Sequence, residues 1–161
     1  MKPLLRIDFA EGAQDLVAIR ELFLEYQARL GVDLGFQSFE AEVRGLPGDY
    51  APPTGRLLLA RQGGRPVGCI ALRGVGPARG EMKRLFVRPG ARGLGLGRQL
   101  VARLIDEARS VGYAELVLDT LPGMAEAQGL YLASGFRDIP PYRPNPIPGA
   151  RFLGLSLDPA P

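Results

Sequence analysis

A strand, a glycine-rich turn, a long amphipathic helix and a second strand follow one another between residues 81 and 120. The helix is the clearest element, because residues 96–111 carry apolar side chains on one stripe and charged side chains outside it. A helix that joins two strands of one sheet places them parallel, with a right-handed crossover in nearly all cases. The unit therefore predicts a mixed α/β fold in which strands 81–88 and 115–120 form a parallel pair.

The rest of the chain predicts further strands and helices around this unit. Residues 56–62 and 66–73 are separated by Gly63-Gly64-Arg65, which is typical of an antiparallel hairpin. Residues 13–30 repeat apolar side chains at steps of three and four and end at Gly31, a residue suited to a helix C-cap. Further elements are expected at residues 6–9 (strand), 38–44 (helix), 122–134 (short helix opened by Pro122) and 150–157 (strand). With 161 residues, the chain is predicted to form a single domain, 1–161.

The chain has no histidine and one cysteine, Cys69. These counts exclude a Ser-His-Asp triad, a Cys-His pair, a histidine or four-cysteine zinc site and an internal disulfide. No metal site is therefore expected. Cys69 stands in an apolar strand and is interpreted as a small buried residue, because an acyl-cysteine route would need an activating partner.

The net charge of +3 is unevenly distributed along the chain. Residues 51–110 carry 12 basic and 3 acidic groups, whereas the flanking segments are net acidic. An anionic ligand is one explanation, and an ordinary solvated surface is the other. Nucleic acid is not expected, because Phe86 is the one aromatic residue in this segment. The chain also lacks a targeting signal and an uncharged apolar run long enough to span a membrane, so a cytoplasmic protein is predicted.

The turn at residues 92–98, Arg-Gly-Leu-Gly-Leu-Gly-Arg, stands between a strand and a helix N-terminus. Glycines allow backbone amides to approach a phosphate closely, and the helix dipole adds attraction for an anion. The dinucleotide pattern G-x-G-x-x-G and the Walker A pattern both fail, which leaves Arg-x-x-Gly-x-Gly. A glycine turn with a purely structural role remains the alternative.

Three ordered motifs give the chain a resemblance to a known family. They are Glu-Met-Lys-Arg-Leu-Phe-Val-Arg-Pro from Glu81, Arg-Gly-Leu-Gly-Leu-Gly-Arg-Gln-Leu from Arg92, and Leu-Tyr-Leu-Ala-Ser-Gly-Phe from Leu130. In this order the motifs resemble the GNAT superfamily of acyl-CoA-dependent N-acetyltransferases, and residues 139–150 resemble a bacterial subgroup of it. The resemblance implies a mostly antiparallel twisted sheet with a central parallel pair and helices on both faces. It also implies an acyl-CoA-binding core at 81–136 and acceptor-side elements at 13–50 and 138–150.

The resemblance assigns acetyl-CoA, as co-substrate, to named residues. The backbone amides of the turn would cradle the pyrophosphate, and the main chain of the preceding strand would bind the pantetheine arm. The residues so assigned are Leu85, Phe86, Val87, Arg92, Gly93, Leu94, Gly95, Leu96, Gly97 and Arg98. For Leu85 and Val87, core packing is compatible with this role, and the side chains of Arg92 and Arg98 would contact phosphates or lie in solvent.

Tyr131 matches the tyrosine that, in many relatives, donates a proton to the departing thiolate, a role that suits a phenol. The alternative is a packed tyrosine with its hydroxyl bonded elsewhere. An asparagine often found seven residues earlier is Met124 here. Because an amine must lose a proton to attack, and histidine is absent, Glu81 at the head of the strand is the candidate base. The competing interpretation of Glu81 is a solvated residue at a strand end.

The acceptor would approach from the remaining surface. Acidic residues in 13–50 would attract a cationic amine or form a solvated face, and Tyr142, Arg143 and Asn145 would shape the pocket from the proline-rich loop. The predicted function is acetyl transfer to a small-molecule or peptide amine in a ternary complex. The competing function is a non-catalytic acyl-CoA-binding or regulatory module. A homodimer is compatible with either.

Overall fold

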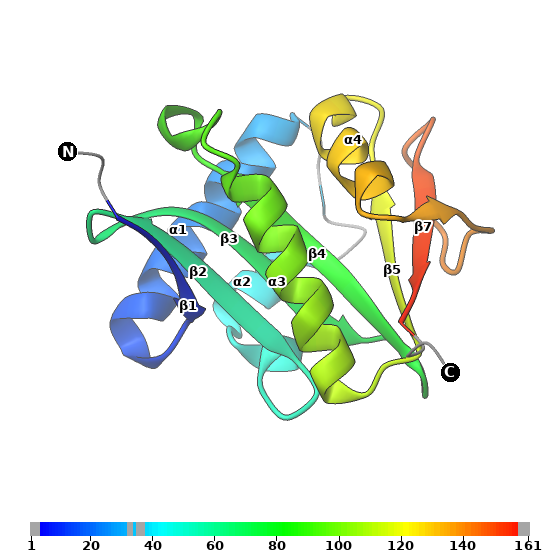
Figure 1. Ribbon diagram of the computed structural model, residues 1–161, viewed down its shortest axis with the longest axis horizontal. Coiled ribbons are helices and arrows are strands. Elements are labelled where there is room, and N and C mark those ends of the chain that lie inside the picture. The colour runs from blue at the N-terminus through cyan, green and yellow to red at the C-terminus, as the bar shows by residue number, and fades with distance from the viewer. Residues whose placement is uncertain (1–3, 32–33, 35–37, 158–161) are drawn as a thin grey trace.

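The computed structural model describes residues 4–31, 34 and 38–157, and Figure 1 shows a central sheet with helices on its two faces. The sheet has seven strands in the order β1-β2-β3-β4-β5-β7-β6. Neighbouring strands are antiparallel except for β4 and β5, which are parallel. The strands are β1 (Leu5–Phe9), β2 (Arg56–Gln62), β3 (Arg65–Gly74), β4 (Arg79–Val87), β5 (Glu115–Thr120), β6 (Arg137–Asp138) and β7 (Arg151–Ser156). The predicted fold class, including the crossover from β4 to β5, is confirmed.

The helices divide the buried core into two layers. They are α1 (Gly12–Leu30), α2 (Phe39–Arg44), α3 (Leu96–Val111) and α4 (Ala125–Ala133), with short 3-10 turns at Gly48–Tyr50 and Pro89–Ala91. One apolar cluster joins α3 and Tyr131 of α4 to one face of the sheet, and the other joins α1 and α2 to the opposite face. None of the helices in the described part of the chain has the length and apolar character needed to cross a bilayer.

Two predicted boundaries are wrong by two or three residues, for identifiable reasons, and the others agree within one residue. Pro122 does not open α4; it lies in a turn closed by the Met124 amide bonding to the Leu121 carbonyl, and the helix begins at Ala125. Strand β4 begins at Arg79 rather than Glu81, because Arg79 and Gly80 already pair with β5. The short strand β6 was not expected, since its two residues have a strand conformation only through pairing with β7.

Many arginines of the basic middle segment form ion pairs within the chain. Arg56 binds Glu107 at 2.8 Å, and Arg61 binds Asp15 of α1. Arg88 contacts Glu25 of α1 at 2.5 Å. Arg61 and Arg88 therefore use part of the positive charge of residues 51–110 to link the sheet to α1.

Candidate active site

Strands β4 and β5 separate after a short parallel contact. Within these two fully described strands, pairing covers Arg79–Glu81 of β4 and Glu115–Val117 of β5. The remaining residues of β4 therefore leave their main chain open on the side that faces β5. A gap of this kind lets groups from both faces of the sheet meet inside the molecule.

A β-bulge changes the direction of the side chains in β4 just beyond this point. The register with β3 shifts between Cys69 and Ala71, and Arg84 adopts a left-handed φ of 63°. Bulges commonly redirect a side chain next to a functional site. Here the side chain of Arg84 extends toward α1 and α2, where Glu42 accepts two hydrogen bonds, at 2.8 and 2.9 Å.

Arg84 is 3% exposed and its guanidinium lies over the rings of Phe39 and Tyr26, at 5.0 and 5.7 Å from their centroids. Burial is the largest single influence and lowers the pKa of Arg84, but the hydrogen bonds to Glu42 and the charges of Tyr50, Glu42 and Tyr26 together raise it on balance. The same pair lowers the pKa of Glu42 against the effect of its own burial. The ion pair therefore links the bulge in β4 to α2, a helix that is distant from it in the sequence.

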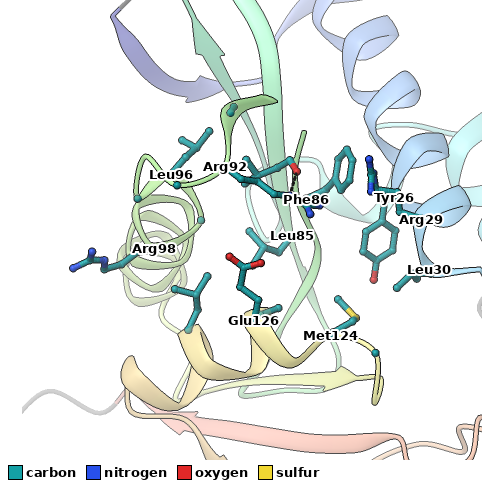
Figure 2. Close-up of a pocket in the computed structure, with 18 residues that line it drawn as sticks. Tyr26, Arg29, Leu30, Leu85, Phe86, Arg92, Leu96, Arg98, Met124 and Glu126 are labelled. Carbon is teal, nitrogen blue, oxygen red and sulfur yellow. Dashed lines mark hydrogen bonds between the residues drawn. The ribbon is translucent and has the colours of Figure 1, made fainter. Parts of the chain in front are cut away.

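An outer cavity of about 450 Å³ opens where β4, the turn after it, α1 and α4 meet (Figure 2). This volume is within the range of small-molecule sites. All the residues assigned to acyl-CoA by the sequence line it, except Leu94, whose side chain is exposed outside it. Residues that the sequence did not assign also line it, among them Tyr26, Arg29 and Leu30 of α1 and Glu126 of α4.

The turn at residues 92–98 has the backbone geometry expected of an anion-binding turn. Gly93 and Gly95 have φ values of 83° and 75°, in the left-handed region that disfavours other residues. A Cβ added at either glycine would meet no atom within 4 Å, so the space beside them is open. The first amides of α3 lack acceptors within the helix, and its first turn contains no acidic residue.

The two arginines of this turn differ in their surroundings. Arg92 donates a hydrogen bond from Nε to the Val87 carbonyl at 3.0 Å, which ties the turn to the end of β4. Arg98 points outward from the cavity in Figure 2, while Glu126 directs its carboxylate into it. Arg92 thus has a defined structural contact in addition to its place in the cavity wall.

A second, inner cavity of about 30 Å³ lies deeper in the gap between β4 and β5. Tyr131 of α4 and Tyr26 of α1 reach it from opposite faces of the sheet, together with Lys83 of β4 and Asp119 of β5. Tyr26, Leu30, Leu85 and Met124 line both cavities and therefore form the junction between them.

Tyr131 is 5% exposed, and its ring packs 5.9 Å from that of Phe136. Burial raises the pKa of Tyr131, and the nearby Tyr26 and Asp119 act in the same direction. Burial also raises the pKa of Tyr26, although Arg84 opposes the shift. Both phenols therefore stay protonated at neutral pH, as a proton donor must.

Asp119 is a site residue that the sequence analysis missed. It lines the inner cavity and accepts a hydrogen bond from Nδ2 of Asn145 at 3.1 Å. The Oδ1 atom of Asn145 accepts the Ile147 amide at 3.0 Å, which fixes the amide group so that its NH₂ faces Asp119. The available signal was a single acid near the carboxyl end of an apolar parallel strand, where ligands commonly bind.

Glu81 lies in a buried ion cluster and is not among the residues that line either cavity. Its side chain is fully buried, and Oε1 accepts a hydrogen bond from Arg73 Nε at 2.9 Å. Oε2 accepts one from the Tyr142 hydroxyl at 2.5 Å and is paired with Arg143, and Lys83 Nζ is 3.9 Å from Oε1. The competing interpretation of Glu81, a solvated residue at a strand end, is therefore wrong. Glu81 joins β4 to the proline-rich loop.

A seven-stranded mixed sheet that opens at its parallel pair, with a cavity at the opening, defines a fold shared with acetyltransferases. A model of the Acetyltransferase (GNAT) family matches residues 16–136. The chain belongs to this family.

Individual relatives agree with this assignment. An uncharacterised N-acetyltransferase of Schizosaccharomyces pombe is 40% identical over 160 residues, covering 98% of each chain. An IAA acetyltransferase of Azospirillum brasilense is 44% identical over 110 residues, covering 66% of this chain and 71% of that protein. The structure of yncA from Salmonella typhimurium, solved with its cofactor acetyl-CoA, gives a TM-score of 0.67 at 26% identity, with 96% and 94% of the chains covered. Because the first of these is a yeast protein, the bacterial subgroup stays a prediction.

Proposed function

We propose that the protein transfers an acetyl group from acetyl-CoA to a primary amine by direct attack in a ternary complex. The observation that carries the proposal is the junction of two cavities. The outer cavity adjoins the glycine turn and the N-terminus of α3, and the inner one brings together a protonated phenol, Tyr131, and a carboxylate, Asp119. This arrangement is suited to a long anionic co-substrate whose reactive end enters the interior.

The residues around the outer cavity fit acetyl-CoA. The amides of residues 93–98 would hold the pyrophosphate, because they combine unpaired N–H groups with the positive end of α3. Main-chain groups of Leu85, Phe86 and Val87 would bind the pantetheine arm along the open edge of β4. When bound, acetyl-CoA supplies an acetyl group activated as a thioester.

Tyr131 would hold the proton that the sulfur takes up as the C–S bond breaks. A thiolate is a leaving group that benefits from a proton donor, and Tyr131, whose pKa burial raises, carries a proton at neutral pH. Its position at the inner cavity supports this role, which the sequence analysis also assigned to it.

For the base, the geometry favours Asp119 over Glu81. Asp119 would accept the proton that the acceptor nitrogen loses as the new C–N bond forms, since its carboxylate lines the cavity that Tyr131 also lines. The two oxygens of Glu81 already accept hydrogen bonds from Arg73 and Tyr142, and Glu81 is also paired with Arg143. The proposal that Glu81 is the base stays a prediction, which the pH profiles described in the Discussion distinguish from the Asp119 assignment.

The acceptor, a small-molecule or peptide amine, would enter on the side of residues 13–50 and 138–150. Asn145 supports this orientation, because it joins the loop of residues 138–150 to Asp119. We retain the division into an acyl-CoA core at 81–136 and these acceptor-side elements as part of the proposal. A homodimer stays a prediction.

A screen of amines with acetyl-CoA, monitored by release of free thiol, tests the proposal. The panel contains amino acids, polyamines and peptides with free N-termini, and isothermal titration of acetyl-CoA runs in parallel. We expect acetyl-CoA binding together with thiol release that depends on at least one amine. Binding without amine-dependent release across the panel would favour the non-catalytic module, and absence of binding would contradict both functions.

A further inference from the structure

The junction of the two cavities sets how large an acyl group can reach the inner site. Under the proposed function, on which this inference rests, the acyl group lies at or beyond the junction. The inner cavity has about 30 Å³, which is room for only one or two groups the size of a water molecule. A methyl group fits this space, and a longer chain requires the wall to move.

Three of the four junction residues come from α1 and β4. The ring of Tyr26 meets Phe86 edge-on at 6.5 Å between centroids and is covered by the Arg84 guanidinium. Leu85 belongs to β4, and Leu30 is the last residue of α1. Of these three side chains, that of Tyr26 is therefore held by its neighbours.

Met124 is the fourth, and it comes from the turn before α4. Its backbone is fixed by two hydrogen bonds, from its own amide to the Leu121 carbonyl at 3.0 Å and from the Gln128 amide to its carbonyl at 2.9 Å. Its sulfur accepts a hydrogen bond from the hydroxyl of Thr120, which is 2% exposed, at 3.7 Å. Met124 thus places an apolar side chain, held at its sulfur, where both cavities meet.

We infer that Met124 limits acyl-chain length, so that the protein accepts acetyl-CoA and discriminates against butyryl-CoA. Shortening this side chain joins the two cavities more widely and makes room for additional methylenes. The inference also gives a role to the methionine that stands where relatives often carry asparagine: an apolar wall in place of a polar contact. Against a close-fitting wall, one methylene is worth about 10- to 200-fold in discrimination.

Titration calorimetry with CoA, acetyl-CoA, propionyl-CoA and butyryl-CoA tests this inference without requiring an acceptor. For the wild type we expect a Kd for butyryl-CoA at least about tenfold above that for acetyl-CoA. In Met124→Ala this ratio should fall to about threefold or less. Met124→Leu, which conserves most of the volume, should keep the wild-type ratio.

Leu130→Ala is the matched control, because Leu130 lines the outer cavity alone and its loss should affect all four ligands alike. If Met124→Ala fails to fold, Met124→Phe provides the second test, since a bulkier wall should weaken acetyl-CoA relative to CoA. Equal affinity of the wild type for acetyl-CoA and butyryl-CoA, or a ratio unchanged by these Met124 substitutions, overturns the inference but leaves the proposed function standing. Failure of the wild type to bind even CoA overturns both.

Discussion

Tyr131 and Asp119 reach the same small cavity from different elements, Tyr131 from α4 and Asp119 from the end of β5. The two groups suit opposite tasks, since a phenol can donate a proton and a carboxylate can accept one. The two side chains can therefore be tested separately, one for the departing thiolate and one for the attacking amine.

Replacing Tyr131 with Phe removes the proposed acid while conserving the ring that packs on Phe136. Once an acceptor is known, we expect kcat to fall about 10²- to 10⁴-fold, because general acid catalysis acts in the transition state. The Kd of acetyl-CoA, measured by titration calorimetry, should change little. Tyr113→Phe is the control, as the hydroxyl of Tyr113 bonds to the Thr54 carbonyl at 2.7 Å and the residue lines neither cavity. A loss of less than about threefold in Tyr131→Phe would indicate a packing role.

Asp119→Asn and Glu81→Gln separate the two candidate bases through their pH profiles. If Asp119 takes the proton, kcat/KM of Asp119→Asn should be lowest relative to wild type at low pH, where the free amine is scarce. The deficit should then shrink as rising pH deprotonates the acceptor unaided. Glu81→Gln should show a deficit independent of pH, because it weakens the contact of β4 with Tyr142 and Arg143. The reverse pattern would assign the base to Glu81, and two flat profiles would exclude both.

Asn145→Ala tests whether the proline-rich loop positions Asp119. The variant removes both the hydrogen bond to Asp119 and the cap on the Ile147 amide. We expect a loss of kcat/KM smaller than that of Asp119→Asn, with the same pH trend. Asn145→Asp offers a contrast, since it retains the cap but places a second carboxylate beside Asp119. Repulsion between the two carboxylates should move the pH profile of kcat/KM toward higher pH. Wild-type profiles in both variants would show that the loop does not position Asp119.

At the scale of elements, the turn before α3 determines whether the helix N-terminus is accessible to an anion. Gly95→Val should weaken acetyl-CoA binding at least about tenfold, because a side chain there occupies the open space beside the amides. The substitution also strains a left-handed backbone, by about 1–2 kcal/mol. Gly112→Val separates the two effects, because Gly112 caps the other end of α3 with φ 103° and equally open surroundings. Urea unfolding should show similar destabilisation in both, whereas calorimetry should show weakened binding in Gly95→Val alone. Equal affinities of the two variants would contradict the role of the turn.

The elements that the sequence predicted best are those whose local pattern agrees with their packing. Strand β2, helix α3 and strand β5 begin and end at the predicted residues. Helix α3 repeats its apolar residues at helical steps between two glycines, and β2 and β5 are short continuous apolar runs. The start of α4 was missed because proline is common in the first helical turn, whereas here Pro122 belongs to the preceding turn.

The cofactor side of the site was also predictable, because it depends on a local motif that places nine of its assigned residues on the outer cavity. The reacting side was not, since it arises from contacts between distant segments. The bulge at Arg84 is held by Glu42, and strand periodicity alone gives no sign of a left-handed arginine. The separation of β4 from β5, which brings Asp119 and Tyr131 to one cavity, is likewise a property of the whole sheet.

For the molecule as a whole, the site is embedded in a buried network of charges. Arg73, Lys83 and Arg84 lie with Glu42 and Glu81 between the sheet and the α1–α2 layer, and Arg143 joins them from the proline-rich loop. Removing one partner of a buried ion pair commonly costs about 3–5 kcal/mol, because it leaves a charge without compensation. The network therefore couples the stability of the fold to the protonation of its members.

Lys83 should give this coupling a measurable pH dependence. Burial lowers its pKa to about 7, with Arg84 and Arg73 acting in the same direction and Asp119 and Glu42 opposing them. Between pH 7 and the ordinary lysine pKa near 10.5, the unfolded chain binds a proton at Lys83 that the folded protein has released, so the free energy of unfolding rises with pH. Below pH 7 Lys83 is protonated in both the folded and the unfolded state, and the folded state bears the cost of its buried charge.

Lys83→Met removes the titrating amine. The variant should be compared with wild type by urea unfolding at pH 6, 7, 8 and 9. The free energy of unfolding of the variant minus that of wild type should be most positive at pH 6–7 and should decrease by about 2–3 kcal/mol toward pH 9. Cys69, whose pKa is raised by burial, lowers stability above its ordinary pKa of 9, but it is present in both proteins and cancels in the difference. Losing the packing contacts of the lysine side chain in the variant would offset the whole curve without changing its slope. Parallel pH curves for the two proteins would therefore show that Lys83 keeps its ordinary proton affinity in the folded state.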